Sequence, residues 1–305
     1  MKKFALRLLL FAAIFLIYDK LFILVARRSA ETEVDKRLEY IVKGEINKDI
    51  IIAGSSTGSR DIMAYKVEEA TGHSTYNLCY AGSNVEFHEY VLKNLVEFNR
   101  KPKVILLMVD DDYELHYHRP LIYRKDRLYP LIEYKPVWTE LARQDKTPVL
   151  FSSFLILQRL TKYNFDLRQK YFTPMDTMIA DGSMPISWKR EDMILEYDTS
   201  NRVYSLEDEI PEKVEAFRGI LEICRDNDIQ LVLVFPPIFR AHSRSFENRI
   251  RELAGDGVNY YIYDRENPIY RDENYYNDET HLMRDGALVF TDEIIRYIHS
   301  EISLQ

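Results

Sequence analysis

Two short polar motifs near opposite ends of the chain contain the side chains that nucleophilic catalysis needs. Near the start, an apolar run leads into Gly54-Ser55-Ser56, and near the end comes Asp278-Glu279-Thr280-His281. A serine hydroxyl becomes a good nucleophile when a base takes its proton, and the base needs a group that orients it. We therefore predict that Ser56 is a nucleophile, that His281 is its general base, and that Asp278 orients the imidazole.

Each of these residues also has a purely structural interpretation. Ser56 could cap the N-terminus of a helix, a position at which Ser and Thr are favoured, although Thr57 and Ser59 compete for that role. His281 could be an ordinary surface histidine on a loop. Order and spacing favour the catalytic interpretation, because the motifs follow segments that read as buried strands.

The elements that must position these motifs alternate along the chain. Apolar runs predict strands at residues 49–53, 76–78, 104–109, 230–235 and 258–263. Amphipathic stretches predict helices at residues 60–71, 85–99, 211–227, 246–254 and 284–302. Such alternation predicts an α/β protein whose five-stranded parallel sheet lies between two layers of helices. In open parallel sheets ligands bind at the carboxyl ends of the strands. The polar groups follow this rule, with Ser56 after the first predicted strand, Gly82 after the second, Asp110 after the third and His281 after the fifth.

The two motifs resemble those of the SGNH/GDSL hydrolase superfamily, in which a Gly-x-Ser block follows the first strand and an Asp-x-x-His block precedes the last helix. The resemblance covers residues 48–303 and is closest to membrane-anchored members that work on acyl groups of bacterial cell-surface polymers. It implies a flavodoxin-like three-layer fold and an acyl-enzyme on Ser56, with no cofactor. Water as the acceptor would make the protein an esterase, and a sugar hydroxyl would make it an O-acyltransferase. Acyl esters of cell-surface glycans, acetyl esters above all, are the implied substrates.

The donors that would stabilise a tetrahedral oxyanion are the least regular part of the pattern. The backbone N–H of Ser56 is one donor, and the resemblance implies the N–H of Gly82 as a second. The family adds an asparagine after the third strand, but this chain has Asp110-Asp111-Asp112 there. An ionised aspartate would repel an oxyanion. Either Asp110 stays outside the oxyanion hole or Asn84 supplies the third donor; alternatively, Asn84 only caps the following helix.

Two other classes of function compete with an enzyme. The missing asparagine would suit a catalytically inactive binding or assembly partner of a membrane acyltransferase. The segment from Gly54 to Ser59 could also cradle a phosphate, as in a flavodoxin-like nucleotide binder. That binder would have no use for the pair formed by Asp278 and His281.

The N-terminal segment predicts a membrane anchor at residues 1–28. Residues 4–26 are almost entirely apolar, and about 20 such residues span a bilayer. A cleaved signal peptide is the alternative, but the run is long for one, and Arg27-Arg28 stand where a cleavage site would lie. Basic residues flank both ends of the run. The very short tail before it favours a cytoplasmic N-terminus and an extracytoplasmic domain.

Three further regions follow the anchor in the expected organisation. Residues 29–47 should form a juxtamembrane helix or linker, with a helical face over 31–43. The SGNH-like domain should occupy residues 48–305, interrupted by an insertion or lid at about 111–208. Within that insertion, residues 149–170 predict a helix.

Composition and charge exclude several functions. The net charge is −8, and no basic stripe is present, which argues against nucleic-acid binding. Cys79 and Cys224 form no Cys-x-x-Cys motif, so zinc-ribbon and thioredoxin functions are excluded, while a disulfide between them stays open. Asp110 to Asp112 could bind a metal with His116 or His118, but we interpret this stretch as a solvated loop and expect no metal. The tyrosines near residues 260–276 could stack on sugars, although packing is the commoner use.

Overall fold

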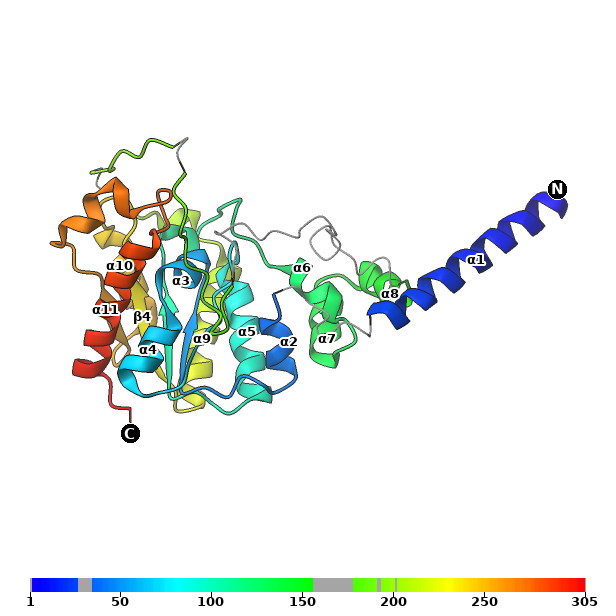
Figure 1. Cartoon of the computed structure of the whole chain (residues 1–305), viewed down its shortest axis with the longest axis horizontal. Helices are drawn as coiled ribbons and strands as arrows, with labels where there is room; N and C mark the ends of the chain where they lie inside the picture. The colour runs from blue at the N-terminus through cyan, green and yellow to red at the C-terminus, as the bar shows by residue number, and fades with distance from the viewer. Residues whose placement is uncertain (1, 27–34, 156–177, 191–192, 201, 305) are drawn as a thin grey trace. The chain divides into compact units, whose positions relative to one another are not determined.

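The computed structural model describes residues 2–26, 35–155, 178–190, 193–200 and 202–304 (Figure 1). The chain divides into two compact units, one formed by Met1–Lys43 with Arg124–Lys170, the other by Gly44–Tyr123 with Tyr171–Gln305. The predicted boundary at residue 111 lies inside the second unit. Every predicted site residue belongs to that second unit.

The second unit is built on a five-stranded parallel sheet. Its strands are β1 (Ile50–Ala53), β2 (Thr75–Asn77), β3 (Val104–Met108), β4 (Gln230–Phe235) and β5 (Asn259–Ile262). Their order is β2-β1-β3-β4-β5, with Ile50 opposite both Thr75 and Val104. This confirms the predicted α/β fold with a parallel sheet. The chain steps one way from β1 to β2 and the other way to β3. The carboxyl ends of β1 and β3 therefore border the switch point at which such sheets bind ligands.

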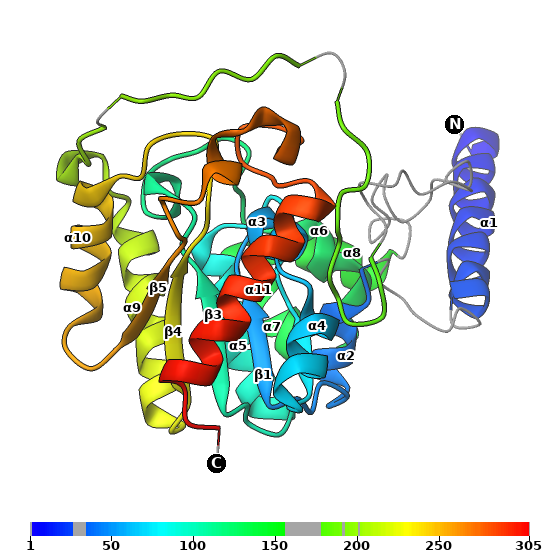
Figure 2. The ribbon, with the colours of Figure 1, turned by 60° about the vertical axis from the view of Figure 1, so that its left-hand side comes forward.

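Helices cover both faces of this sheet (Figure 2). On one face α11 (Arg284–Glu301) packs against α3 (Ser56–Asp61) and α4 (Ala64–Thr71). On the other, α5 (Val85–Phe98) packs against α9 (Pro211–Asp226), and α10 (Arg244–Ala254) contacts α9. Short 3-10 helices occur at Asp112–Glu114, Leu206–Asp208, Pro268–Arg271 and Glu273–Tyr275. This arrangement is consistent with three α/β/α layers.

The strands read as continuous apolar runs because helices cover both of their faces. Ile50 and Ile52 share one hydrophobic cluster with Phe290 and Ile294 of α11. Side chains alternate along a strand, so the fully buried Ile51 points to the opposite face. Both layers of helices are thus held to the sheet by apolar contacts.

The helix predicted at residues 60–71 is two helices in the structure. The short helix α3 begins at Ser56, and α4 begins after Ile62 and Met63, with Ile62 extended at φ −122° and ψ 125°. Ser, Thr and Gly are weak helix formers, which is why the sequence pattern missed α3. Gly58 of α3 packs closely against Cys79: an added Cβ would lie 2.4 Å from the Cys79 Sγ, so glycine fits there and a larger residue does not. The other predicted elements of this unit match the observed ones to within one or two residues at each end.

Gly54 makes the turn between β1 and α3 possible. Its φ is 142°, a conformation that L side chains rarely adopt, and an added Cβ would lie 2.7 Å from the Met108 Cβ on β3. The chain can therefore pass tightly over the end of β3 and place Ser56 at the switch point.

The first unit is helical. Its elements are α1 (Lys2–Ala26), α2 (Arg37–Val42), α6 (Lys125–Leu128), a 3-10 helix at Tyr129–Leu131, α7 (Lys135–Gln144) and α8 (Lys146–Phe154). Apolar side chains of α1 are exposed, among them Phe4, Leu9 and Phe11. Within the part of the chain that the structure describes, no helix has both the length and the apolar character needed to cross a membrane.

Two predicted helices fall partly outside the described residues. Of the helix expected at 31–43, residues 37–42 form α2, with Leu38 and Ile41 buried, and residues 31–34 lie outside the described part. Of the helix expected at 149–170, residues 149–154 belong to α8, and residues 156–170 lie outside it. The sequence pattern did not predict α7, whose buried residues are Val137 and Leu141.

Candidate active site

Ser56 lies at the first position of α3, directly after the turn that ends β1. Ser55 precedes it in an extended conformation at the N-cap position. Both neighbours of Ser56 are buried, whereas Ser56 itself is half-buried. The first N–H groups of a helix have no partner within that helix. The turn therefore offers both a hydroxyl and a backbone donor at the surface.

The structure brings His281 to this hydroxyl. The Ser56 Oγ lies 2.7 Å from the His281 Nε2, across 225 residues of sequence. A loop between β5 and α11 carries the histidine, and two backbone hydrogen bonds support that loop. Phe239 N–H donates to the Glu279 carbonyl at 2.8 Å, and Asn277 N–H donates to the His281 carbonyl at 2.9 Å. The predicted nucleophile and base are therefore in direct contact.

Asp278 lies on the far side of the imidazole. Its two carboxylate oxygens are 2.8 and 2.9 Å from the His281 Nδ1. One of them also accepts from the backbone N–H groups of Thr280 and His281, each at 3.0 Å. A carboxylate can only accept, so Nδ1 carries the proton and Nε2 is free to accept from Ser56. The neighbouring Glu279 is exposed.

The surroundings keep Asp278 ionised. Burial on its own would raise the pKa of this carboxyl group. Hydrogen bonding and positive charge from His281, together with the donors of Thr280, outweigh burial and hold the pKa of Asp278 well below its usual range. An ionised Asp278 is what stabilises a protonated imidazole.

Asp110, after β3, lies against the turn that carries Ser56. Its two oxygens accept hydrogen bonds from the hydroxyls of Ser55 and Thr57, the residues on either side of Ser56. Burial raises the pKa of Asp110, and the hydrogen bonds from Ser55 and Thr57 offset only part of that effect. The sequence allowed Asp110 to be a charge near an oxyanion, a possible metal ligand or part of a solvated loop, but it did not predict these two contacts. No local pattern signals its two partners, which lie more than 50 residues away in the chain.

The two predicted oxyanion residues differ in their surroundings. Gly82 has a φ of 70°, which explains why glycine stands there, and its carbonyl accepts from the Ile122 N–H at 3.0 Å. The side chain of Asn84 accepts from the Phe87 N–H at 3.1 Å and donates to the Glu86 Oε2 at 2.8 Å. Asn84 therefore caps α5, as one of its two sequence interpretations expected.

The side chains of Asp111, His116 and His118, after β3, each have a different partner. The Asp111 carboxylate pairs with Arg240. The His116 Nε2 donates to the Ser205 carbonyl at 2.8 Å, and His118 stacks on Tyr113 with ring centroids 3.8 Å apart. Among the described residues, no group of histidine, cysteine and acidic side chains is arranged to hold a metal ion.

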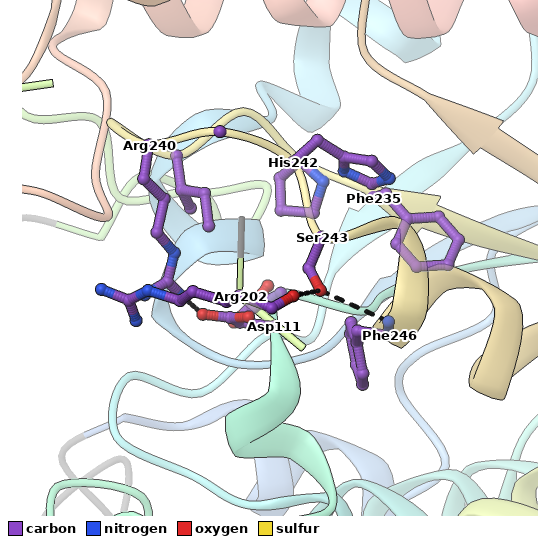
Figure 3. A pocket seen from close by; sticks show the side chains of 11 residues that line it. Asp111, Arg202, Phe235, Arg240, His242, Ser243 and Phe246 are labelled. Atoms are coloured by element: carbon purple, nitrogen blue, oxygen red, sulfur yellow. Dashed lines mark hydrogen bonds and ion pairs between the residues drawn. The ribbon is translucent and has the colours of Figure 1, made fainter. Parts of the chain in front are cut away.

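A small cavity lies beside this stretch, at the end of β4 (Figure 3). Arg202 and Arg240 lie on one side of it and Phe235 and Phe246 on the other. Its volume is about 20 Å³, which is room for about one water molecule. Arg240, which lines the cavity, forms an ion pair with Asp111. This cavity is therefore too small to be the substrate pocket.

Both cysteines and three of the tyrosines at residues 260–276 are buried. Cys79 and Cys224 are both buried and no disulfide joins them, and burial raises the pKa of the Cys224 thiol to about 12. Tyr263, Tyr270 and Tyr276 are buried, and the rings of the first two meet edge to face at 5.2 Å. Such buried rings are not available to stack on a sugar.

Comparisons with known proteins do not identify a family for this chain. No protein-family model matches the chain, and no curated protein is significantly similar to it.

Proposed function

We propose that Ser56, His281 and Asp278 form the catalytic triad of an SGNH-type acyl-transfer enzyme, a serine esterase or O-acyltransferase. The observation that carries this proposal is the continuous chain of contacts from the Ser56 Oγ to the His281 Nε2 at 2.7 Å and from the Nδ1 to Asp278 at 2.8 Å. The three groups are in the order that a serine nucleophile requires, and the lowered pKa of Asp278 keeps that carboxylate available to the imidazole.

The proposed reaction proceeds in two halves. The Ser56 Oγ attacks the carbonyl carbon of an ester while its proton passes to the His281 Nε2. The imidazolium then gives this proton to the departing alcohol, and the acyl group remains bonded to Ser56. In the second half, water or a sugar hydroxyl loses its proton to Nε2 and attacks the carbonyl carbon of the acyl-enzyme. The bond between the acyl group and the Ser56 Oγ then breaks, and Oγ takes the proton back from Nε2. Asp278 stays ionised throughout and stabilises the imidazolium.

We assign the oxyanion donors to the backbone N–H groups of Ser56 and Gly82. Ser56 N–H is at the start of α3, and Gly82 follows the neighbouring strand β2. The amide of Asn84 donates to Glu86 and its oxygen caps α5. Using it as a third donor would cost both contacts, so we assign Asn84 to the helix and not to the oxyanion.

We propose acyl esters of cell-envelope glycans as the substrate class, with acetyl as the acyl group. Membrane attachment through α1, with the catalytic domain outside the cytoplasm, is part of the same proposal. The exposed apolar side chains of α1 support it. A membrane acyltransferase could supply or receive the acyl group at such a location.

Labelling with a serine-reactive fluorophosphonate tests the proposal. The full-length protein should be labelled stoichiometrically, the Ser56→Ala variant should not, and Ser300→Ala, a change at an exposed serine of α11, should behave as the unaltered protein. Equal labelling of the Ser56→Ala variant would refute the assignment. If the unaltered protein is not labelled at all, a non-catalytic partner of an acyl-transfer system becomes the better interpretation.

A further inference from the structure

The helix that carries the nucleophile also contacts the loop that carries the base. Ser56 is the first residue of α3, and Asp61 is its last. Asp61 is fully buried, and its Oδ1 accepts from the backbone N–H of Leu282 at 3.0 Å. Leu282 directly follows His281 in the chain. One six-residue helix therefore holds the nucleophile at one end and the base loop at the other.

Leu282 is a firm point by which to hold this loop. Its side chain is fully buried, and its backbone forms an antiparallel bridge with Tyr276. The residues between Tyr276 and Leu282 include both Asp278 and His281. Fixing Leu282 therefore fixes the base of the loop that carries the catalytic pair.

We propose that Asp61 is a positioning residue that sets the distance between the Ser56 Oγ and the His281 Nε2. This inference rests on the function proposed above. Asp61 touches neither the nucleophile nor the base, and acts through the backbone of Leu282. A base displaced by about 1 Å can cost about a hundredfold in rate, so a short rigid link between the two reacting groups matters.

The charge of Asp61 is consistent with such a role. Burial raises the pKa of Asp61 well above its usual range, and the negative charges of Asp110 and Asp278 raise it further, against the Leu282 N–H and Arg60. A neutral carboxyl group accepts from Leu282 without competing with Asp278 for the imidazolium. The other oxygen, Oδ2, is buried and has no hydrogen-bond partner among the described residues. Asparagine has the shape of this neutral group and keeps its acceptor.

The test compares Asp61→Asn, which keeps the acceptor, with Asp61→Leu, which removes it. On the full-length protein we would measure the fluorophosphonate labelling rate of Ser56 and the hydrogen exchange of a peptide covering residues 277–284. We expect Asp61→Asn to keep the labelling rate within about threefold, and Asp61→Leu to lower it by about 10- to 100-fold with faster exchange at Leu282. If Asp61→Leu does not fold, Asp61→Ala takes its place with the same expectation.

Thr291→Val is the matched control. Thr291 of α11 is fully buried and accepts from the Met63 N–H at 3.1 Å, just beyond the end of α3. Its hydroxyl also donates to the backbone carbonyls of Ala287 and Asp61, at 2.7 and 3.5 Å. The hydrogen bonds that Thr291→Val loses involve neither the Asp61 carboxyl group nor the base loop, so this variant should lower stability while leaving the labelling rate unchanged. Equal losses of labelling in Thr291→Val and Asp61→Leu would show a general structural effect and overturn the inference.

The remaining outcomes separate this inference from the proposed function. A labelled unaltered protein with an equally fast Asp61→Leu variant overturns the positioning role alone. A slow Asp61→Asn variant also overturns it, because the acceptor is kept in that variant. An unaltered protein that is not labelled overturns the proposed function and this inference with it.

Discussion

At the scale of single residues, two hydroxyl neighbours hold the turn that carries Ser56, the proposed nucleophile. Ser55 and Thr57 both donate to Asp110, so one carboxyl group holds the turn on either side of Ser56. This contact gives the aspartate after β3 a structural role at the position where the SGNH/GDSL family, which the motifs resemble, has an asparagine. A neutral acceptor at residue 110 would satisfy the same hydroxyls.

We predict that Asp110→Asn is tolerated and that Asp110→Leu is not. Hydroxyl groups can accept as well as donate, so an asparagine amide can pair with both Ser55 and Thr57. Leucine leaves two buried hydroxyls without their acceptor, at about 1–3 kcal/mol each. Chemical denaturation and fluorophosphonate labelling of the two variants check this. An Asp110→Asn variant that is as damaged as Asp110→Leu would show that the negative charge itself is needed.

At the scale of elements, α5 combines a capped start with a buried histidine. Asn84 caps the helix, and His88, one turn later, is buried with its Nε2 2.7 Å from the Ser83 Oγ. Burial, assisted by the positive charge of Lys213, lowers the pKa of His88 to about 3. The helix therefore contains a histidine that is neutral in the folded protein.

This histidine predicts a loss of stability in acid. In the unfolded chain, His88 binds a proton below a pKa of about 6.5, whereas the folded protein binds it only near pH 3. The unfolded state thus holds more protons between these values, and stability falls as the pH decreases from 6.5 towards 3. Between pH 7 and pH 5 the contribution is about 2 kcal/mol.

The His88→Gln variant isolates this effect, because glutamine stays polar and does not titrate. Urea denaturation at pH 7 and pH 5 should show a smaller loss of unfolding free energy for this variant than for the unaltered protein, by about 2 kcal/mol. Equal losses for the two proteins would mean that His88 can be protonated in the folded state.

At the scale of the whole molecule, the proposed triad and the N-terminal helix α1 belong to different units. Ser56, Asp278 and His281 all lie in the unit formed by residues 44–123 and 171–305, and α1 lies in the other. The proposed triad draws no side chain from α1. Attachment and catalysis should therefore be separable by deletion.

We predict that deleting residues 1–26 abolishes membrane attachment and leaves the labelling of Ser56 intact. The exposed apolar side chains of α1 are the reason to expect attachment, since burying them in lipid is favourable. Fractionation with a carbonate wash, followed by labelling of each fraction, measures both properties. A full-length protein that the wash removes, or a shortened protein that stays with the membrane, would contradict the prediction.

The sequence alone was sufficient to predict the sheet and the order of the motifs that contain Ser56 and His281. Strands covered on both faces need continuous apolar runs, and these runs, alternating with amphipathic helices, leave little choice of architecture. Parallel strands end at one edge, so the residues that follow β1 and β5 lie at the same edge of the sheet. Residue type and position along the chain therefore mark Ser56, Asp278 and His281 as candidates, while the path of the loop before α11 decides that His281 meets Ser56.

Only the tertiary structure decided how the site is held. Asp110 binds Ser55 and Thr57, and Asp61 binds Leu282, across separations of 53 residues or more. A periodic pattern reports which face of an element is buried, but it does not report which distant partner a buried polar group will meet. Helix α3 likewise forms from residues of low helical propensity, and Gly58 within it packs so closely on Cys79 that a larger side chain would not fit. These contacts depend on how separate elements fit together, so no local pattern could predict them.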